Sequence, residues 1–154
     1  MLQREHSQVL ETLELFRING LSEIGINILA QGMIQLRELD VGWCRSINVA
    51  TGCVVNLALN ARHLEKISLS ALRQVSDTEL LAMSQLENLT QLDVMGSRFV
   101  TMNGVMNLLS KCTKLQLLDL SYCEALTESL DIRISQLKAS YPNCCIVYSH
   151  CFNE

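Results

Sequence analysis

Proline and aromatic residues are scarce in this chain of 154 residues. Pro142 is its single proline, and aromatic residues make up 5% of the sequence. Because there is also no low-complexity run, the composition gives no sign of a linker or of a second domain. A core with so few aromatic rings must be largely aliphatic, and the 27 leucines can supply it. We therefore expect one domain with stacked aliphatic side chains inside.

Positive charge and long apolar runs are lacking as well. The formal net charge is −4, so the chain has no excess of the basic side chains that neutralise phosphates, and nucleic acid is not expected as a partner. No apolar run approaches the roughly 20 residues that a membrane span needs. The N-terminal stretch carries Glu5, Glu11 and Glu14, a pattern unlike a secretory signal or a transit peptide.

What the chain does have is a hydrophobic spacing that recurs five times. When the first leucine of each copy is counted as position 1, apolar or small residues return at positions 4, 6, 9 and 12. The copies begin at Leu10, Leu36, Leu64, Leu89 and Leu115, which lie 26, 28, 25 and 26 residues apart. This spacing and period are typical of leucine-rich repeats. They predict an α/β fold, a right-handed leucine-rich-repeat solenoid with parallel strands on the concave face and helices outside.

Each copy continues from its strand into a helical pattern. A serine or threonine precedes each expected helix, where its hydroxyl could accept hydrogen bonds from free backbone amides. These residues are Ser22, Thr51, Ser76, Thr101 and Thr127, and the helices are expected at 23–30, 52–61, 77–84, 102–110 and 128–138. Ser76 with Glu79 has the sequence of a capping box. The helix side chains expected in the core are Ile24, Ile28, Leu29, Val54, Val55, Leu59, Leu80, Leu81, Met83, Val105, Leu108, Leu109, Leu130, Ile134 and Leu137.

The repeats divide the chain into three segments. Residues 1–9 are interpreted as the remnant of a preceding repeat or cap, residues 10–140 as five repeats of about 26 residues, and residues 141–154 as a C-terminal closing strand. The pattern leaves open whether Ile146 or Val147 faces the core. A segment as short as 1–9 cannot cover the first repeat. We therefore expect either that the chain is the C-terminal piece of a longer array or that something else covers this edge.

Seven cysteines are spread along the chain, and their number is odd. Cys44 and Cys123 both occupy position 9 of a repeat, where a small apolar side chain is expected to be buried. This pattern favours free thiols in a reducing, intracellular compartment over a disulfide framework. Cysteine and histidine also gather in residues 144–151. Because adjacent Cys144 and Cys145 would point to opposite faces of a strand, no metal site is expected there.

Three segments carry the signature of one repeat subtype. Its features are cysteine at position 9, an aliphatic residue at position 12 and an acid at the start of the helix. Residues 44–47 show the first two, residues 75–77 the last two, and residues 123–128 all three. These segments resemble the cysteine-containing repeats of F-box/leucine-rich-repeat proteins. Further strings, at 39–44, 51–53, 91–98 and 118–123, are similar to a mitochondrion-associated member of that family.

The resemblance implies a role in protein recognition. Members of that family are substrate receptors of Skp1–cullin–F-box E3 ubiquitin ligases. The resemblance therefore implies a protein substrate on the concave face, a cytoplasmic or mitochondrion-associated location, and a part in mitochondrial quality control. Skp1 and a cullin are expected partners only if an F-box lies upstream in the full gene product. The alternative is a stand-alone repeat scaffold or regulator outside the ubiquitin system, because this chain contains no recognisable F-box.

Two charged columns and three large side chains mark a candidate binding surface. Position 5 of the repeats is mostly acidic, position 10 is rich in arginine, and large apolar residues lie just past the strands. Aromatic and arginine side chains are frequent anchors of protein interfaces. A second interpretation stays open, in which these side chains only solvate the strand face or pack over a neighbouring loop. The residues predicted to bind a partner are Trp43, Arg45, Arg73, Met95, Arg98, Tyr122, Asp40, Asp93 and Asp119.

Nothing in the sequence points to catalysis or to a cofactor. The histidines are His6, His63 and His150, and His63 lies at a helix–strand corner with no cysteine in register. No glycine-rich loop follows a strand in phosphate-binding spacing. We expect a protein that is not an enzyme and that has no catalytic, cofactor-binding or metal-ligating residues.

Overall fold

The computed structural model describes residues 10–126 and 130–149, except for the side chains of residues 130–132. Strands and helices alternate along this part of the chain. The strands are β1 (Thr12–Glu14), β2 (Glu38–Asp40), β3 (Lys66–Ser68), β4 (Gln91–Asp93), β5 (Leu117–Asp119) and β6 (Cys145–Val147). The α-helices are α2 (Glu23–Gly32), α3 (Cys53–Asn60), α4 (Asp77–Met83), α5 (Met102–Lys111) and α6 (Leu130–Ser140). Two short 3-10 helices, η1 (Val49–Thr51) and η2 (Glu124–Leu126), follow β2 and β5.

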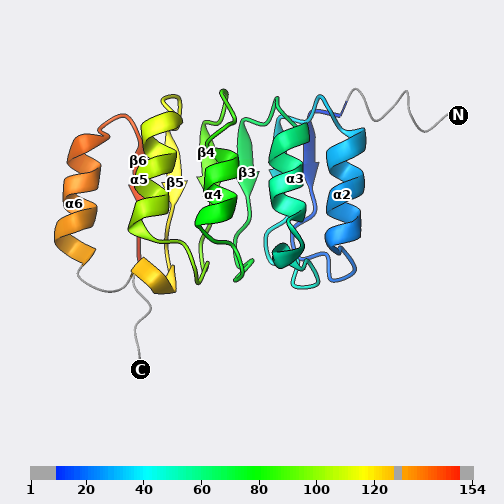
Figure 1. Cartoon of the computed structure of the whole chain (residues 1–154), viewed down its shortest axis with the longest axis horizontal. Helices are drawn as coiled ribbons and strands as arrows, with labels where there is room; N and C mark the ends of the chain where they lie inside the picture. Colours follow the sequence, from blue (N-terminus) through cyan, green and yellow to red (C-terminus); the bar gives the residue numbers. More distant parts are fainter. Residues whose placement is uncertain (1–9, 127–129, 150–154) are drawn as a thin grey trace, which may run out of the picture.

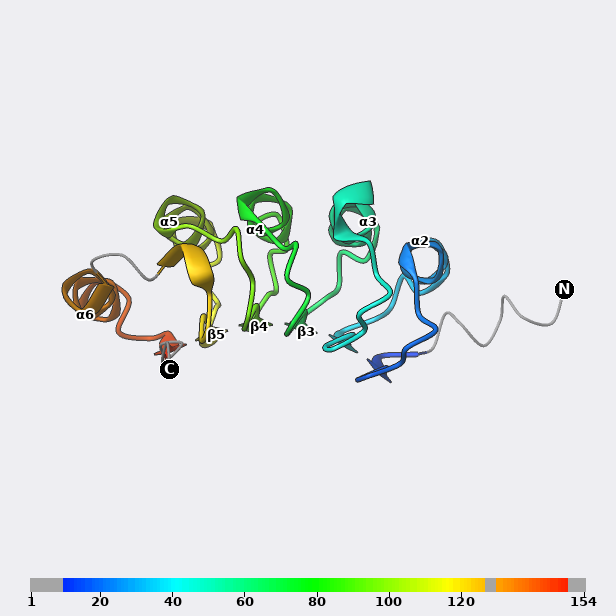
Figure 2. The ribbon, with the colours of Figure 1, turned by 90° about the horizontal axis from the view of Figure 1, so that it is seen from below.

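The strands form one parallel sheet in chain order, from β1 to β6 (Figure 1). The register aligns equivalent repeat positions, so that Leu13 pairs with Leu39, and Asp93 pairs with Asp119. Seen along the strands, the sheet lines the inside of a shallow arc and the helices lie outside it (Figure 2). This confirms the predicted leucine-rich-repeat solenoid.

The core lies between the sheet and the helix layer. The residues at position 4 of the second to fifth repeats are at most 3% exposed, since every second strand residue points inward. The last strand continues this ladder, because Ile146 pairs with Leu118 and is buried, whereas Val147 is 36% exposed. Of the two residues between which the sequence could not decide, Ile146 is therefore the one that faces the core.

Four of the helix residues expected in the core are instead exposed. In α2 the buried residues are Ile26 and Ala30, while Ile24 and Ile28 are 66% and 65% exposed. In each of these two pairs the residues are four positions apart, so each pair lies on one face of the helix. Periodicity alone does not say which face meets the sheet. Leu59 and Leu81 were wrongly assigned for a similar reason. Their immediate neighbours Ala58, Leu80 and Ala82 take the inner face.

The expected helix caps are correct at only one described site. Ser76 and Glu79 form a complete capping box at the start of α4. By contrast, Ser22 and Thr101 make no side-chain cap hydrogen bond, and the hydroxyl of Thr51 donates to the carbonyl of Asn48. The helix after Thr51 begins only at Cys53, preceded by a left-handed Gly52. Thr127 lies outside the described residues.

The start of α5 is held by a carboxylate from the preceding repeat. The backbone N–H of Thr101 donates to Oδ1 of Asp77 at 2.8 Å, and the Thr101 hydroxyl donates to Oδ2 at 2.6 Å. A side chain at Gly104 would place its Cβ 2.1 Å from Asp77 Oδ1. The glycine inside α5 therefore makes room for this contact between repeats.

The first repeat is less covered than the others. Leu13 and Leu15 are only partly buried, and Ile18 is 46% exposed, whereas the position-9 residue Cys44 of the next repeat is fully buried. Residues 1–9, interpreted above as a remnant repeat or cap, lie outside the described residues. In the described part of the chain, no helix combines the length and apolarity needed to cross a bilayer.

Burial should protect the repeat cysteines from thiol reagents. Cys44 and Cys123 are free and fully buried, and burial raises the pKa of Cys123 to about 12. Because the thiolate is the reactive form, site-resolved mass spectrometry after maleimide treatment should show both unmodified in the native chain. The exposed Cys145 serves as the internal control and should react first among the six described cysteines. Fast labelling of Cys44 and Cys123 without denaturant would show that the repeats do not stack as described.

Removing the cap between repeats should weaken the fold. Asp77→Ala leaves the Thr101 amide without its acceptor and should lower the free energy of unfolding by about 1–2 kcal/mol in urea titrations. Asp77→Asn is the matched control, because it keeps one acceptor oxygen and should lose less. Equal urea midpoints for wild type and Asp77→Ala would mean that this contact does not stabilise the stack.

Candidate functional site

The turn after each strand has a left-handed residue at repeat position 8. Most residue types avoid this conformation, which costs roughly 1–2 kcal/mol for a residue with a side chain. Here it recurs in five successive turns, and only one of them uses glycine. The residues are Arg17, Trp43, Ala71, Gly96 and Tyr122, with φ of 61°, 61°, 60°, 77° and 58°.

These turns are stacked by backbone hydrogen bonds. The N–H at position 8 donates to the carbonyl at position 7 of the following repeat, as from Trp43 to Ser70 at 2.8 Å and from Ala71 to Met95 at 2.7 Å. The same bond joins Tyr122 to Ser149 beyond the last strand. The stacking sets the position-8 side chains side by side along one rim of the solenoid.

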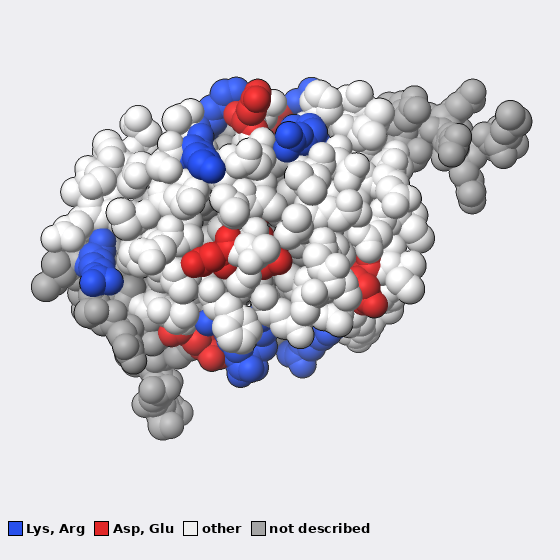
Figure 3. All heavy atoms as spheres, in the orientation of Figure 1, with Lys and Arg blue, Asp and Glu red and all other residues white. Residues whose placement is uncertain are grey.

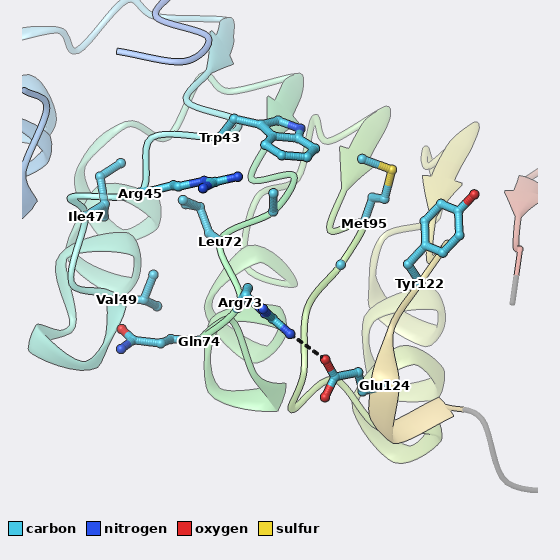
Figure 4. Close-up of a pocket in the computed structure, with 12 residues that line it drawn as sticks. Trp43, Arg45, Ile47, Val49, Leu72, Arg73, Gln74, Met95, Tyr122 and Glu124 are labelled. Atoms are coloured by element: carbon cyan, nitrogen blue, oxygen red, sulfur yellow. Dashed lines mark hydrogen bonds and ion pairs between the residues drawn. The ribbon is translucent and has the colours of Figure 1, made fainter. Parts of the chain in front are cut away.

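The size of these side chains shapes a groove in the rim. Trp43 and Tyr122 are large, whereas Ala71 and Gly96 between them are small, which leaves a depression of about 720 Å³. In Figure 4 the rings of Trp43 and Tyr122 stand on either side of Met95, and Leu72 lies close to Arg45. We call this depression the rim groove. It is lined by Trp43, Arg45, Ile47, Val49, Ala71, Leu72, Arg73, Gln74, Met95, Gly96, Tyr122 and Glu124.

Two arginines lie over the tryptophan at one end of the rim groove. The guanidinium carbon of Arg17 is 5.2 Å from the Trp43 ring centre, and that of Arg45 is 5.5 Å from it. Contacts of this kind contribute about 0.5–1 kcal/mol each at exposed sites. They favour this arrangement of the indole and both guanidinium groups in the absence of a partner.

The other end of the rim groove is an ion-pair network. Oε1 of Glu124 accepts from Arg73 at 2.8 Å and from Arg98 at 2.9 Å, and so links three successive repeats. The hydrogen bonds from Arg73 and Arg98 lower the pKa of the Glu124 carboxyl. All three side chains are 43–57% exposed, so solvent screening leaves this network little stabilising effect on the fold.

The acidic residues at position 5 lie elsewhere, on the strand face. Asp40 and Asp93 line a second, smaller groove of about 330 Å³, and Asp119 pairs with Asp93 in the sheet register. In each case Oδ1 accepts the backbone N–H two residues on, at 2.8–2.9 Å, which closes the turn. Burial raises the pKa of the Asp93 carboxyl, and the neighbouring carboxylates of Asp119 and Asp40 add to this effect.

The structure thus divides the predicted binding residues between two places. The rim groove contains Trp43, Arg45, Arg73, Met95 and Tyr122, and Arg98 joins it through Glu124. The three aspartates lie on the strand face and each has a role in its own turn. Sequence reasoning missed Ala71 and Gly96, which create the groove, and gave Glu124 no role in binding. A comparison of side-chain size at position 8 across the repeats would have identified Ala71 and Gly96.

The described part of the chain brings together no candidate metal ligands. Within residues 10–126 and 130–149, no three His, Cys, Asp or Glu side chains come together as metal ligands. Cys144 is buried and Cys145 is exposed, as expected for neighbours on a strand. His150 and Cys151 lie outside the described residues.

Comparison with known proteins supports the resemblance noted in the sequence. No protein-family model matches the chain. Over 71 residues it is 44% identical to F-box/LRR-repeat protein 4 of Bos taurus. That stretch covers 46% of this chain but only 11% of the curated relative, so the chain spans a small part of that protein's length.

Solved structures support the fold. A chain in the yeast Rad7 and Elc1 complex matches with a TM-score of 0.66 and 19% identity, over 88% of this chain and 32% of that chain. Internalin C2 of Listeria monocytogenes matches with a TM-score of 0.50 and 17% identity, over 93% and 74%. At such identities the likeness shows the fold alone. The chain is therefore a leucine-rich-repeat module that is similar, over part of its length, to an F-box/leucine-rich-repeat protein.

The geometry of position 8 predicts a variant that fills the rim groove without unfolding the chain. Ala71 already has the φ of Trp43, so Ala71→Trp adds no backbone strain and directs the new ring into the groove. Its free energy of unfolding should stay within about 1 kcal/mol of wild type in urea titrations. A large loss of stability would show that the space above Ala71 is needed for packing.

Proposed function

We propose that this module recognises a partner protein through the rim groove. The observation that carries the proposal is the pair of aromatic residues, Trp43 and Tyr122, on either side of a depression with an apolar floor. Tryptophan, tyrosine and arginine are the residues most often found at the energetic centres of interfaces. Tyr122 is 46% exposed and so has surface to bury against a partner.

The rigidity of the site supports this function. Backbone hydrogen bonds between the turns and the arginine contacts on Trp43 fix the groove before binding. A preformed site loses less conformational entropy when a partner docks. The charged side chains of the rim can also steer a partner during approach. In Figure 3 basic and acidic groups lie along both the upper and the lower edge, and the lower edge is where the turns after the strands lie.

The similarity to F-box/LRR-repeat protein 4 suggests the pathway. Its name joins an F-box to leucine-rich repeats, so we propose that the module selects the substrate of a Skp1–cullin–F-box ubiquitin ligase. Docking of Skp1 and a cullin would then fall to an F-box elsewhere in a longer product. The mitochondrial role implied by the sequence resemblance is part of this proposal. Co-purification of Skp1 with a full-length product, but not with the repeats alone, would separate this role from that of a stand-alone scaffold.

Truncation of the aromatic anchor should weaken partner binding. For a partner identified by crosslinking to the wild-type chain and then purified, Trp43→Ala should cost about 2 kcal/mol or more in calorimetric titration. Ala71→Trp should abolish binding by filling the groove. Met106→Ala on the exposed face of α5 is the control and should bind like wild type.

Melting curves of each variant separate a binding effect from loss of structure. Normal binding by both folded groove variants would rule out the rim groove as the site. The acidic row on the strand face, with Asp40, Asp93 and Asp119, would then be the next surface to test.

A further inference from the structure

The charges of the rim groove differ between its two ends. Among the described residues, neither Arg17 nor Arg45 forms an ion pair, and both guanidinium groups lie over Trp43. At the other end the positive charge of Arg73 is opposed by the Glu124 carboxylate, which also binds Arg98. The end with Arg17 and Arg45 therefore carries two unopposed positive charges, whereas at the other end Glu124 offsets one of the two arginine charges.

We infer that the rim groove binds an extended peptide segment that places an aromatic or large aliphatic side chain next to an aspartate or glutamate. This inference rests on the proposed function and names the chemistry of the partner. The apolar side chain occupies the gap above Ala71 and Gly96, between Trp43 and Tyr122. The peptide carboxylate meets Arg45, with Arg17 beside it.

The dimensions of the repeat limit the spacing of the two peptide residues. Neighbouring strands lie about 5 Å apart, so the second repeat, which carries Arg45, is roughly 7 Å from the middle of the gap between the third and fourth repeats. An extended chain rises about 3.3 Å per residue. The acid should therefore lie one or two residues from the apolar side chain.

The stacked arginines suit a carboxylate. A guanidinium that lies over an indole keeps its N–H groups in its own plane, where two of them can bind both oxygens of one carboxylate. The contact with Trp43 restrains Arg45 in advance, so less side-chain entropy is lost on binding. This positive end is distinctive because the chain as a whole carries a net charge of −4.

Glu124 gives the bound segment a direction. Its carboxylate offsets part of the positive charge of Arg73 and Arg98, so an acid is attracted more weakly near Tyr122 than near Arg45, which disfavours the reversed orientation. Negative charge is therefore expected at the Trp43 end of the segment and not at the other. Neutralising Arg45 should therefore weaken peptide binding, whereas neutralising Glu124 should strengthen it. A purely structural role of the two residues would not give these opposite effects.

Random twelve-residue peptides displayed on phage provide a probe, because the true partner is not needed. Selection uses the wild-type chain, with removal of every peptide that also binds Ala71→Trp. Phage fusion leaves the peptides no free C-terminal carboxylate, so any acid selected is a side chain. The selected sequences should show Asp or Glu one or two residues from an aromatic or large aliphatic residue.

Amidated synthetic copies of these peptides then measure the contact by fluorescence anisotropy. Arg45→Gln should weaken binding about tenfold, as should Glu→Gln in the peptide, and the two changes together should cost little more than either alone. Glu124→Gln should tighten binding about threefold, with a steeper salt dependence. Melting curves confirm that the variants are folded, and the change made in the peptide needs no protein variant at all.

The possible results distinguish a failure of the charge inference from a failure of the proposed function. Peptides that need the open groove but carry no nearby acid, or that ignore Arg45→Gln, would overturn the charge inference and leave the groove as a binding site. Weaker binding by Glu124→Gln would overturn the assigned direction. A selection that yields no peptide able to distinguish wild type from Ala71→Trp would overturn the proposed function itself.

Discussion

The stacking of this solenoid depends on the hydrogen bond that leaves the left-handed residue of each turn. The strands are only three residues long, so few sheet hydrogen bonds join one repeat to the next. The bond from position 8 to the following turn extends this contact beyond the strand. It requires a positive φ at Arg17, Trp43, Ala71 and Tyr122, a strain that the surrounding packing must overcome.

The same turn gives the molecule its recognition surface. A left-handed residue at the end of a strand cannot place its side chain in the core ladder, so position 8 is free of the packing rule that selects leucine at positions 1, 4 and 6. The backbone of the turn is nearly constant from repeat to repeat, and side-chain size alone decides whether the rim is raised or hollow. The rim groove is therefore a difference between side chains on a uniform scaffold, with small residues in two turns and aromatic rings in their neighbours.

The two charged columns have different roles because of their distance from the turn. The acids at position 5 reach the backbone N–H two residues on, and their charge is partly used in closing their own turns. The arginines at position 10 lie beyond the turn, where no backbone group needs them. They instead contact Trp43 or Glu124. Glu124 occupies the arginine position of the fifth repeat, and this one change of charge makes the two ends of the groove unlike.

The sequence by itself determined the fold, because the leucine spacing recurs with a nearly constant period and only stacked parallel strands bury every copy. It also marked Cys44 and Cys123 as buried thiols and Trp43, Met95 and Tyr122 as rim residues. Which face of α2 meets the sheet, and whether Ile146 or Val147 enters the core, was decided by the tertiary structure, since both choices are equally apolar along the chain. The groove also needed the structure. Ala71 and Gly96 lie 25 residues apart in the sequence. The hydrogen-bonded stacking of their turns brings these two small residues next to each other, between the rings of Trp43 and Tyr122, and so forms the groove.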